Sequence, residues 1–348
     1  MARSRTILLV ALLVASALLT FAPAAPAALQ PGVITDWAPS PPDGQFAESM
    51  AIDSHGTIYV SNTVWGAWSD AQQDYLSNVG EIWRVEPNGD KTKVASMEVT
   101  SYGMFLGVAI DGNDRVYVLV DDFHDDYGLP PVVGDGVFRL GGHHLTRVVD
   151  LPLASWPNGL AFHKGYLYVS DSSLGCVWRA RVGDEVSTPA APWIEDPLLG
   201  PSTSWIGING IAFKGDALYG IVSAYGRVVR VPVKSDGTAG GVSVLCTWPQ
   251  LKTGDGIAFD VLGRLWVVTN GSKVTPDGGL WRVAPDGGLT KIANDPGWLN
   301  YPVMPVFGRT AASAATLYVL NGAYHDYLDG SAPDIISLQV GVAGLPLR

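Results

Sequence analysis

The sequence predicts an all-β protein folded as a six-bladed β-propeller. One short phrase, first seen as ESMAID and last as VMPVFG, returns six times along the chain at intervals of 46 to 58 residues. Each copy is followed by further apolar or alternating runs, separated by Gly, Asp and Asn turns, and this pattern is typical of antiparallel strands. No segment has a sustained 3.6-residue apolar period, so we expect few helices. Four-stranded units without helical crossovers hide their edges by packing radially around a channel.

The fifth repeat shows its four runs most clearly. It reads GDGIAFD, RLWVVTN, GLWRVAP and LTKIAN, with turns at VLG and DGG. The first repeat gives ESMAID, TIYVSN, EIWRVE and TKVASM, and the third ends in a less regular run near residues 192–194. On this pattern the blades begin near residues 46, 104, 156, 207, 253 and 301.

The sixth repeat ends after three runs, MPVFG, TLYVLN and DIISLQV, and a spare run at residues 33–37 precedes the first repeat. We expect this N-terminal strand to complete the last blade and close the ring, because closure leaves no long edge unpaired. Residues 28–348 are therefore predicted to form a single six-bladed domain.

The N-terminus has the layout of a secretory signal peptide. Arg3 and Arg5 precede an apolar run at residues 7–21, and small residues offer cleavage after Ala24 or Ala27. The alternative is an uncleaved membrane anchor, for which a run of 15 residues is short. We expect residues 1–27 to be removed and the mature protein to be secreted, extracellular or periplasmic, and monomeric.

The net charge of −11 argues against nucleic acid and anionic membranes as partners. A disulfide between the two cysteines, Cys176 and Cys246, is left open, because they fall in different repeats.

Each copy of the phrase has a small central residue, and these are Ala51, Ala109, Ala161, Ala212, Ala258 and Val306. The residue three positions before each of them is here called the register residue. These six residues are Glu48, Leu106, Asn158, Asn209, Asp255 and Val303. Four of them carry side-chain oxygens, which suit Ca²⁺ and not Zn²⁺, so we expect one calcium ion at these residues and leave a second, structural ion open. The alternative is that the Asn-Gly and Asp-Gly pairs are ordinary turns. The shared offset, and a Glu without any turn signal, favour the metal site.

Loops between the second and third strands are long in blades one, two and six, at residues 62–80, 121–136 and 321–333. We expect them to stand over the end of the channel where the first strands begin, here called the mouth, and to serve binding.

Further substrate contacts are expected around the register residues. Leu106 and Val303 would form the dry side of the pocket. Trp156 and Trp205 would line an apolar wall, unless they pack between blades. Asp171 would contact substrate or cap a turn.

Two histidines, His124 and His325, fall in the mouth loops among acidic residues, while the other four histidines fall on the far face. Both are predicted to transfer protons during catalysis, and the alternative is that they are exposed loop residues. The triplet Asn270-Gly271-Ser272 matches an N-glycosylation sequon.

The stretches WPNGLAFHKGYLYVSDS and GDGIAFDVLGRLWVVT resemble the calcium-dependent propeller hydrolases. This superfamily includes gluconolactonase and senescence-marker-protein-like proteins, diisopropyl fluorophosphatases and paraoxonases. The resemblance implies that Glu48, Asn158, Asn209 and Asp255 hold a calcium ion at the channel floor. It also implies hydrolysis of a lactone, ester or phosphotriester, with the metal polarising the carbonyl or phosphoryl oxygen. Asp255 would act as nucleophile, as general base or only as ligand. No paraoxonase-like histidine pair is apparent.

Two other functions compete with a hydrolase of small molecules. The first is a non-catalytic propeller with a structural calcium ion, whose long loops in blades one, two and six bind a partner or saccharide. The second is a quinone-dependent sugar dehydrogenase, which would need a basic, His-bearing pocket. The acidic register residues argue against the dehydrogenase.

Overall fold

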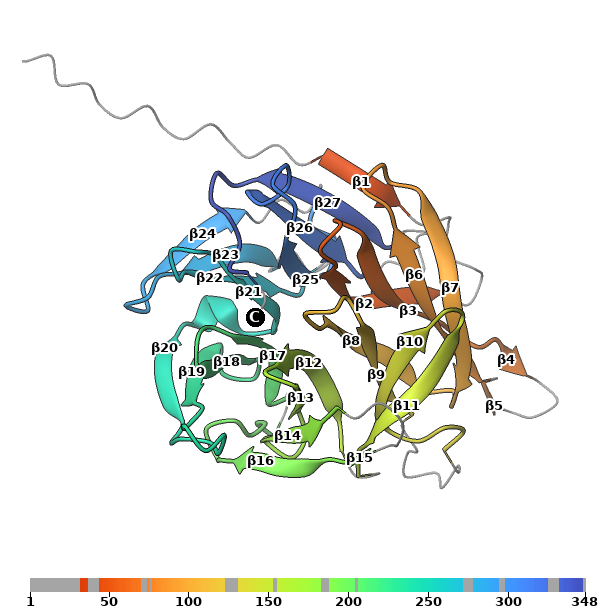
Figure 1. Cartoon of the computed structure of the whole chain (residues 1–348), viewed down its shortest axis with the longest axis horizontal. Coiled ribbons are helices and arrows are strands. Elements are labelled where there is room, and N and C mark those ends of the chain that lie inside the picture. Colours follow the sequence, from red (N-terminus) through yellow and green to blue (C-terminus); the bar gives the residue numbers. More distant parts are fainter. Residues whose placement is uncertain are drawn as a thin grey trace, which may run out of the picture.

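The computed structural model describes residues 32–36, 44–69, 74–75, 77–122, 131–152, 155–182, 188–203, 206–271, 278–293, 298–324 and 332–346. These residues form an all-β, six-bladed propeller, as predicted, with six sheets arranged around one central axis (Figure 1). The only helical segment among the described residues is a 3₁₀ turn, η1 (Pro249–Leu251).

The first three blades are antiparallel sheets whose strands follow the chain order outward from the channel. Blade one contains β2 (Gln45–Ile52), β3 (Ile58–Val64), β6 (Asn78–Val85) and β7 (Lys91–Val99). Blade two contains β8 (Met104–Ile110), β9 (Val116–Asp121), β10 (Gly136–Gly141) and β11 (His144–Asp150). Blade three contains β12 (Pro157–His163), β13 (Tyr166–Asp171), β14 (Cys176–Arg181) and β16 (Ala191–Glu195).

The last three blades repeat this order. Blade four contains β17 (Ile208–Phe213), β18 (Ala217–Val222), β19 (Arg227–Pro232) and β20 (Ser243–Thr247). Blade five contains β21 (Gly254–Phe259), β22 (Leu265–Thr269), β23 (Gly279–Val283) and β24 (Leu289–Ala293). Blade six contains β25 (Pro302–Phe307), β26 (Thr316–Asn321), β27 (Asp334–Gln339) and, from the other end of the chain, β1 (Gly32–Asp36).

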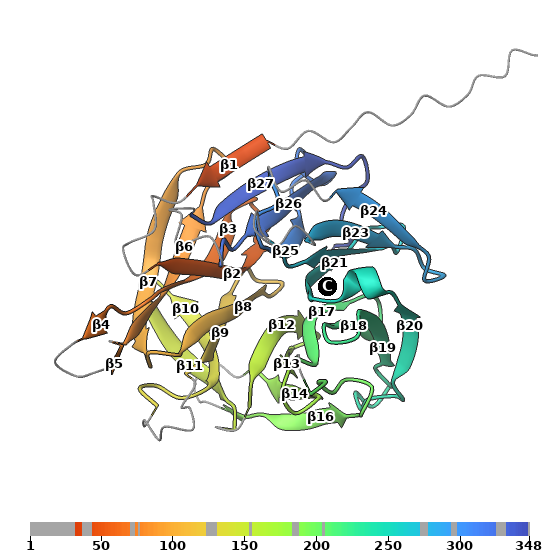
Figure 2. The ribbon, with the colours of Figure 1, turned by 180° about the vertical axis from the view of Figure 1, so that it is seen from behind.

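Strand β1 closes the ring, because it pairs antiparallel with β27 and supplies the outer strand of blade six. Both views of the molecule show β1 lying beside β27 (Figures 1 and 2). The inner strands contact one another in the order β2, β8, β12, β17, β21, β25 and back to β2. The N-terminal strand therefore joins the first and last blades in the way that the spare run predicts.

Two short additions lie outside the repeat. The long loop of blade one contains a two-stranded sheet, β4 (Trp68–Ser69) with β5 (Asp74–Tyr75). In blade three the chain makes a detour after β14, in which β15 (Thr188–Pro189) pairs in parallel with β11 of blade two. This detour covers part of the outer edge of blade two.

Aspartates fix the hairpins between the first and second strands at the far face. In Asp53, Asp111 and Asp260 the Oδ1 atom accepts hydrogen bonds from the backbone N–H groups two and four residues later. Asp side chains favour such turns because they can replace a backbone acceptor. The turn aspartates of the repeat therefore stabilise the hairpins and, unlike the register residues, have a structural role.

Apolar side chains fill the spaces between neighbouring blades. Cys176 is buried in the cluster between blades two and three, and Cys246 packs against the cluster between blades four and five. Both cysteines are free thiols, so the disulfide left open by the sequence is not formed. Among the residues that the structure describes, no helix is long and apolar enough to span a membrane.

Candidate functional site

Every first strand has a β-bulge at its register residue. The pairing with the second strand shifts between Ala47 and Ser49, Phe105 and Val108, Pro157 and Leu160, Ile208 and Ile211, Gly254 and Ile257, and Pro302 and Met304. A bulge leaves a residue unpaired, bends the strand and turns a side chain out of the regular alternation. The six register residues read from the sequence lie inside these six irregularities. The bulge is therefore the local feature that turns selected side chains toward the channel.

The glycines that follow three register residues are required by close packing between blades. None of these three glycines has a positive φ, so they are not turn glycines. A Cβ atom would lie 2.6 Å from Asn209 O at Gly159, 2.2 Å from Asp255 O at Gly210, and 2.5 Å from Val303 O at Gly256. Real Cβ atoms do not approach a carbonyl oxygen this closely, because the backbone itself would have to move. The alternative that these pairs are ordinary turns is therefore wrong.

Two buried serines fasten the bulges to the next blade. Ser170 Oγ accepts the N–H of Gly159 at 2.8 Å and donates to Asn209 O at 2.5 Å. Ser61 Oγ accepts the N–H of Ser49 at 3.1 Å and donates to the carbonyl of the next blade's register residue at 2.6 Å. Sequence reasoning missed both residues, although the shared serine in YVSN and YVSD was a visible signal.

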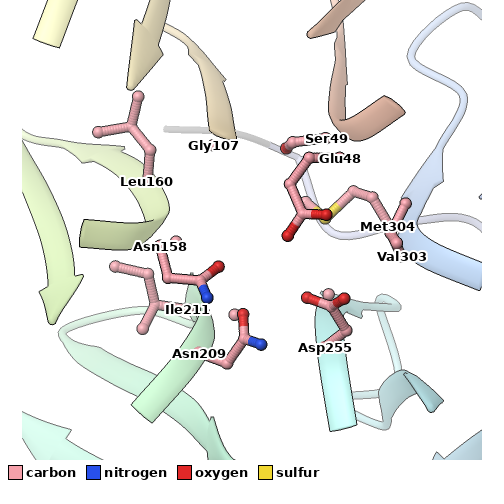
Figure 3. Close-up of a pocket in the computed structure, with 13 residues that line it drawn as sticks. Glu48, Ser49, Gly107, Asn158, Leu160, Asn209, Ile211, Asp255, Val303 and Met304 are labelled. Atoms are coloured by element: carbon pink, nitrogen blue, oxygen red, sulfur yellow. The ribbon is translucent and has the colours of Figure 1, made fainter. Parts of the chain in front are cut away.

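The four oxygen-bearing register residues line one pocket at the mouth. Glu48, Asn158, Asn209 and Asp255 come from β2, β12, β17 and β21 and point toward a common space, whereas Leu160 and Ile211 point away from it (Figure 3). The cavity volume is about 20 Å³, room for a single ion or water molecule. The described residues that line it are Glu48, Ser49, Gly107, Asn158, Gly159, Leu160, Asn209, Gly210, Ile211, Asp255, Gly256, Val303 and Met304.

The two carboxyl groups of the pocket repel each other in the metal-free protein. Burial raises the pKa of Asp255 to about 7, while hydrogen bonds from the side chains of Asn270 and Asn209 act in the opposite direction. Burial, and then the negative charge of Asp255, raise the pKa of Glu48 well above its ordinary value. A cation between the two carboxylates would remove both penalties, because it favours their ionised forms.

The chemistry of the donor set fits a hard divalent cation. Calcium accepts carboxylate and carboxamide oxygens in a flexible geometry, and the pocket supplies two of each. Within the described part of the chain, no three His, Cys, Asp or Glu side chains gather into a metal-binding group. The described lining has two carboxylates, Glu48 and Asp255, and no His or Cys, so it differs from the His and Cys centres that bind zinc. That these four residues bind calcium stays a prediction.

The two apolar register residues have different positions. Val303 belongs to the lining of the pocket together with Met304, but its side chain is only 1% exposed and packs in a core cluster, so its contact with substrate stays a prediction. Leu106 does not line it, because its side chain, only 2% exposed, packs in the core between blades two and three. Gly107 lies at the pocket in its place. The prediction that Leu106 contacts substrate is wrong, since an apolar side chain gains more from burial between the blades.

Asp171 caps a turn and does not face the pocket. Its fully buried carboxylate accepts N–H groups from Trp156 at 3.3 Å, Ser173 at 3.0 Å and Leu174 at 2.9 Å through Oδ1. Its Oδ2 accepts the indole N–H of Trp178 at 3.0 Å. With both oxygens occupied, Asp171 cannot bind substrate without losing these bonds.

The remaining predicted site residues are outside the pocket or outside the described residues. Trp156 is 37% exposed and does not line the pocket, so it forms no wall there. Trp205, His124 and His325 lie outside the described residues.

Sequence reasoning missed one residue that touches the site directly. Asn270 donates from Nδ2 to Asp255 Oδ2 at 2.8 Å, although it was singled out only as part of a sequon. Its carboxamide is engaged inside the protein, which argues against glycosylation at this position.

No family model matches the chain, and no curated protein matches its sequence. Solved structures do share its fold. A proposed gluconolactonase is 17% identical, with a TM-score of 0.58 over 92% of this chain and 95% of its own. A calcium-binding protein, regucalcin from Agrobacterium tumefaciens, is 16% identical, with a TM-score of 0.55 over 90% and 98%. The PQQ-bound aldose sugar dehydrogenase of Streptomyces coelicolor is 16% identical, with a TM-score of 0.52 over 90% and 99%.

At these identities the similarity concerns the fold alone. It confirms the expected resemblance to gluconolactonase-type propellers at that level. Because a sugar dehydrogenase shares the same architecture, the fold does not choose between hydrolysis and oxidation. The choice must come from the residues of the pocket.

Proposed function

We propose that this protein is a calcium-dependent hydrolase of a lactone, an ester or a phosphotriester. One observation carries the proposal: bulges in four blades bring the oxygens of Glu48, Asn158, Asn209 and Asp255 to one pocket of single-ion size. The printed names of two proteins with the same fold, a proposed gluconolactonase and a calcium-binding regucalcin, support it.

These four side chains would hold the ion, and a bound calcium ion would supply a Lewis acid that polarises a carbonyl or phosphoryl oxygen. Two amide and two carboxylate donors leave coordination positions for water and substrate. Met304, beside the buried Val303, lines one side of the pocket and would keep water away from that side. Asp255 is the carboxylate that we assign to proton abstraction or nucleophilic attack, because it lines the pocket and a bound cation would keep it ionised.

The pocket chemistry separates this proposal from a quinone-dependent dehydrogenase. No Lys, Arg or His belongs to the described lining of the pocket, whereas an anionic quinone cofactor requires cationic partners. The other competitor, a non-catalytic propeller with structural calcium, fits the same donor set. It predicts melting that depends on calcium and no hydrolysis of any substrate offered.

The decisive experiment combines metal analysis with a hydrolysis screen. Purified protein is offered sugar lactones, acyl-homoserine lactones, aryl esters and phosphotriesters, with chelator and after calcium is returned. We expect turnover of at least one class that chelation abolishes and calcium restores. Full activity after exhaustive chelation would rule the proposal out. Chelation-sensitive melting without hydrolysis would favour the binding propeller instead.

We also infer that the protein is exported and acts as a monomer. The basic residues Arg3 and Arg5 and the apolar run at residues 7–21 support export, although they lie outside the described residues. Expression of the full chain followed by N-terminal sequencing should give a mature protein that starts at Ala25 or Ala28. An intact N-terminus on membrane-bound protein would contradict export by cleavage.

A further inference from the structure

Four blades use one side chain at the mouth end of the second strand to hold the next blade. In each case the side chain bonds to the backbone of the residue immediately before the next register residue. The four contacts join Thr63 to Phe105 N at 3.0 Å, Ser172 to Ile208 O at 2.8 Å, Ser223 to Gly254 O, and Asn270 to Pro302 O at 3.3 Å. This repeated contact, here called the clasp, is a structural device of the fold.

Blade five departs from the pattern because its clasp residue is longer. Thr63, Ser172 and Ser223 each carry a hydroxyl group on Cβ, which can reach only the neighbouring backbone. Asn270 carries a carboxamide with two hydrogens on Nδ2. That nitrogen lies 3.3 Å from Pro302 O and 2.8 Å from Asp255 Oδ2, so one group serves both the clasp and the pocket.

The backbone holds this carboxamide in place. The N–H of Asn270 donates to Thr253 O at 3.0 Å, and Thr253 Oγ1 donates back to Asn270 O at 3.2 Å. Thr253 has a φ of 60°, a left-handed conformation that a β-branched residue adopts only when its surroundings impose it. Thr253 also precedes Asp255 by two residues. The strand that carries the carboxylate and the strand that carries its amide partner are therefore fastened to each other beside the pocket.

We propose that Asn270 is a positioning residue that fixes the orientation of the Asp255 carboxylate for calcium. The inference rests on the proposed function, since it concerns the same ion. With Oδ2 held by a fixed amide at 2.8 Å, the carboxylate cannot rotate freely about its bond to Cβ. It then faces the other donors of the pocket before the ion arrives. Groups that orient a ligand in this way typically contribute 10- to 100-fold to metal affinity.

The chain itself suggests the variant that separates the two roles. Asn270→Ser installs the residue that blades three and four use, so the clasp to Pro302 O is kept while the contact with Asp255 is lost. Thr63→Val is the matched control. It removes a clasp next to Phe105, whose neighbouring register residue does not line the pocket.

The test titrates calcium into the chelated full-length mature protein by calorimetry, with melting in excess chelator and steady-state kinetics as further readouts. We expect Asn270→Ser to bind calcium about 10- to 100-fold more weakly, with a metal-free melting temperature close to that of the wild type. At saturating calcium, kcat should fall more than KM rises, since the ion is misplaced while the apolar contacts remain. Thr63→Val should keep the wild-type calcium affinity.

Two outcomes would overturn the inference in distinguishable ways. If the wild type binds no calcium, the proposed function fails and the role of Asn270 fails with it. If the wild type binds calcium and Asn270→Ser binds it equally well, only the positioning role is wrong. Should the serine variant fold poorly, Asn270→Thr, which copies the hydroxyl clasp of blade one, is judged by the same criterion.

Discussion

Removal of calcium should make the stability of this protein depend on pH in a defined direction. In the folded, metal-free pocket, burial raises the pKa of Asp255 to about 7 from an ordinary value of 3.8. A carboxyl group whose pKa is raised by folding stabilises the folded state while it is protonated. That contribution is complete below about pH 4 and is lost as the pH rises through about 7.

The size of the effect follows from the shift. The rise in the pKa of Asp255 from 3.8 to about 7 corresponds to about 4 kcal/mol, because each tenfold change in proton affinity is worth about 1.36 kcal/mol. Roughly 3 kcal/mol of this should be lost between pH 5 and pH 8, because about two of the three pH units between those pKa values lie in that interval. Glu48 adds to the loss, since its pKa is also raised by burial and by the charge of Asp255. Calcium should remove the loss, because a cation in the pocket favours both ionised forms.

Urea unfolding followed by tryptophan fluorescence measures this at pH 5 and pH 8, in chelator and in excess calcium. Asp255→Asn is the control, and its metal-free form should show a much weaker dependence. Among the described residues outside the pocket lining, Asp121 and His163 also have shifted pKa values: burial raises the pKa of Asp121 and lowers that of His163. Both remain in the Asp255→Asn variant, as does Glu48 with the rise in pKa that burial causes, so the difference between the two proteins isolates the contribution of Asp255.

A metal-free protein that is equally stable at pH 5 and pH 8, and unchanged by Asp255→Asn, would show that burial of the Asp255 carboxyl does not affect stability. It would mean that water or other groups already stabilise the ionised carboxylates, so that a cation would have no electrostatic penalty to remove. The same measurement in calcium then decides whether the ion interacts with the pocket at all.

Three further predictions concern single residues of the site. Glu48→Gln should abolish calcium binding and turnover, yet raise the melting temperature in chelator at pH 8, since it removes a buried carboxyl group that burial and the charge of Asp255 disfavour in its ionised form. A lower melting temperature would contradict repulsion between Glu48 and Asp255. Gly210→Ala should destabilise the protein by about 1–3 kcal/mol or more and weaken calcium binding, because its Cβ would lie 2.2 Å from Asp255 O; unchanged urea unfolding would show that the blades are not so close. Asp171→Asn should cost about 1–3 kcal/mol of stability with KM unchanged, whereas a raised KM with normal stability would restore its role as a substrate contact.

The fold was predictable because each repeat is recognisable from short stretches of sequence. Turn residues, alternating runs and the spare N-terminal strand are short-range signals, and each acts in the same way in every blade. Even the register residues could be found, because the β-bulge recurs at one offset in all six first strands. Repetition thus made a tertiary feature visible in the primary structure.

The rest of the site depends on contacts between blades, which no local pattern records. Asn270 reaches Asp255 from another strand. The residue after each register Asn or Asp must be glycine, because a Cβ atom there would clash with a backbone carbonyl of the next blade. Leu106 occupies the register position, but its side chain packs in the core, because burial stabilises an apolar side chain more than a position at the pocket does. The sequence places Asp171 at the mouth end of its strand, but it does not record the five hydrogen bonds that occupy its carboxylate.

The four converging side chains, Glu48, Asn158, Asn209 and Asp255, are proposed to form a catalytic calcium site. The most direct test is the initial rate of hydrolysis of the best substrate from the screen, measured against the concentration of free calcium. We expect a rate that falls to background without calcium, saturates as calcium is added, and stays at background in Asp255→Ala at every calcium concentration. A wild-type rate that does not change with free calcium would contradict it.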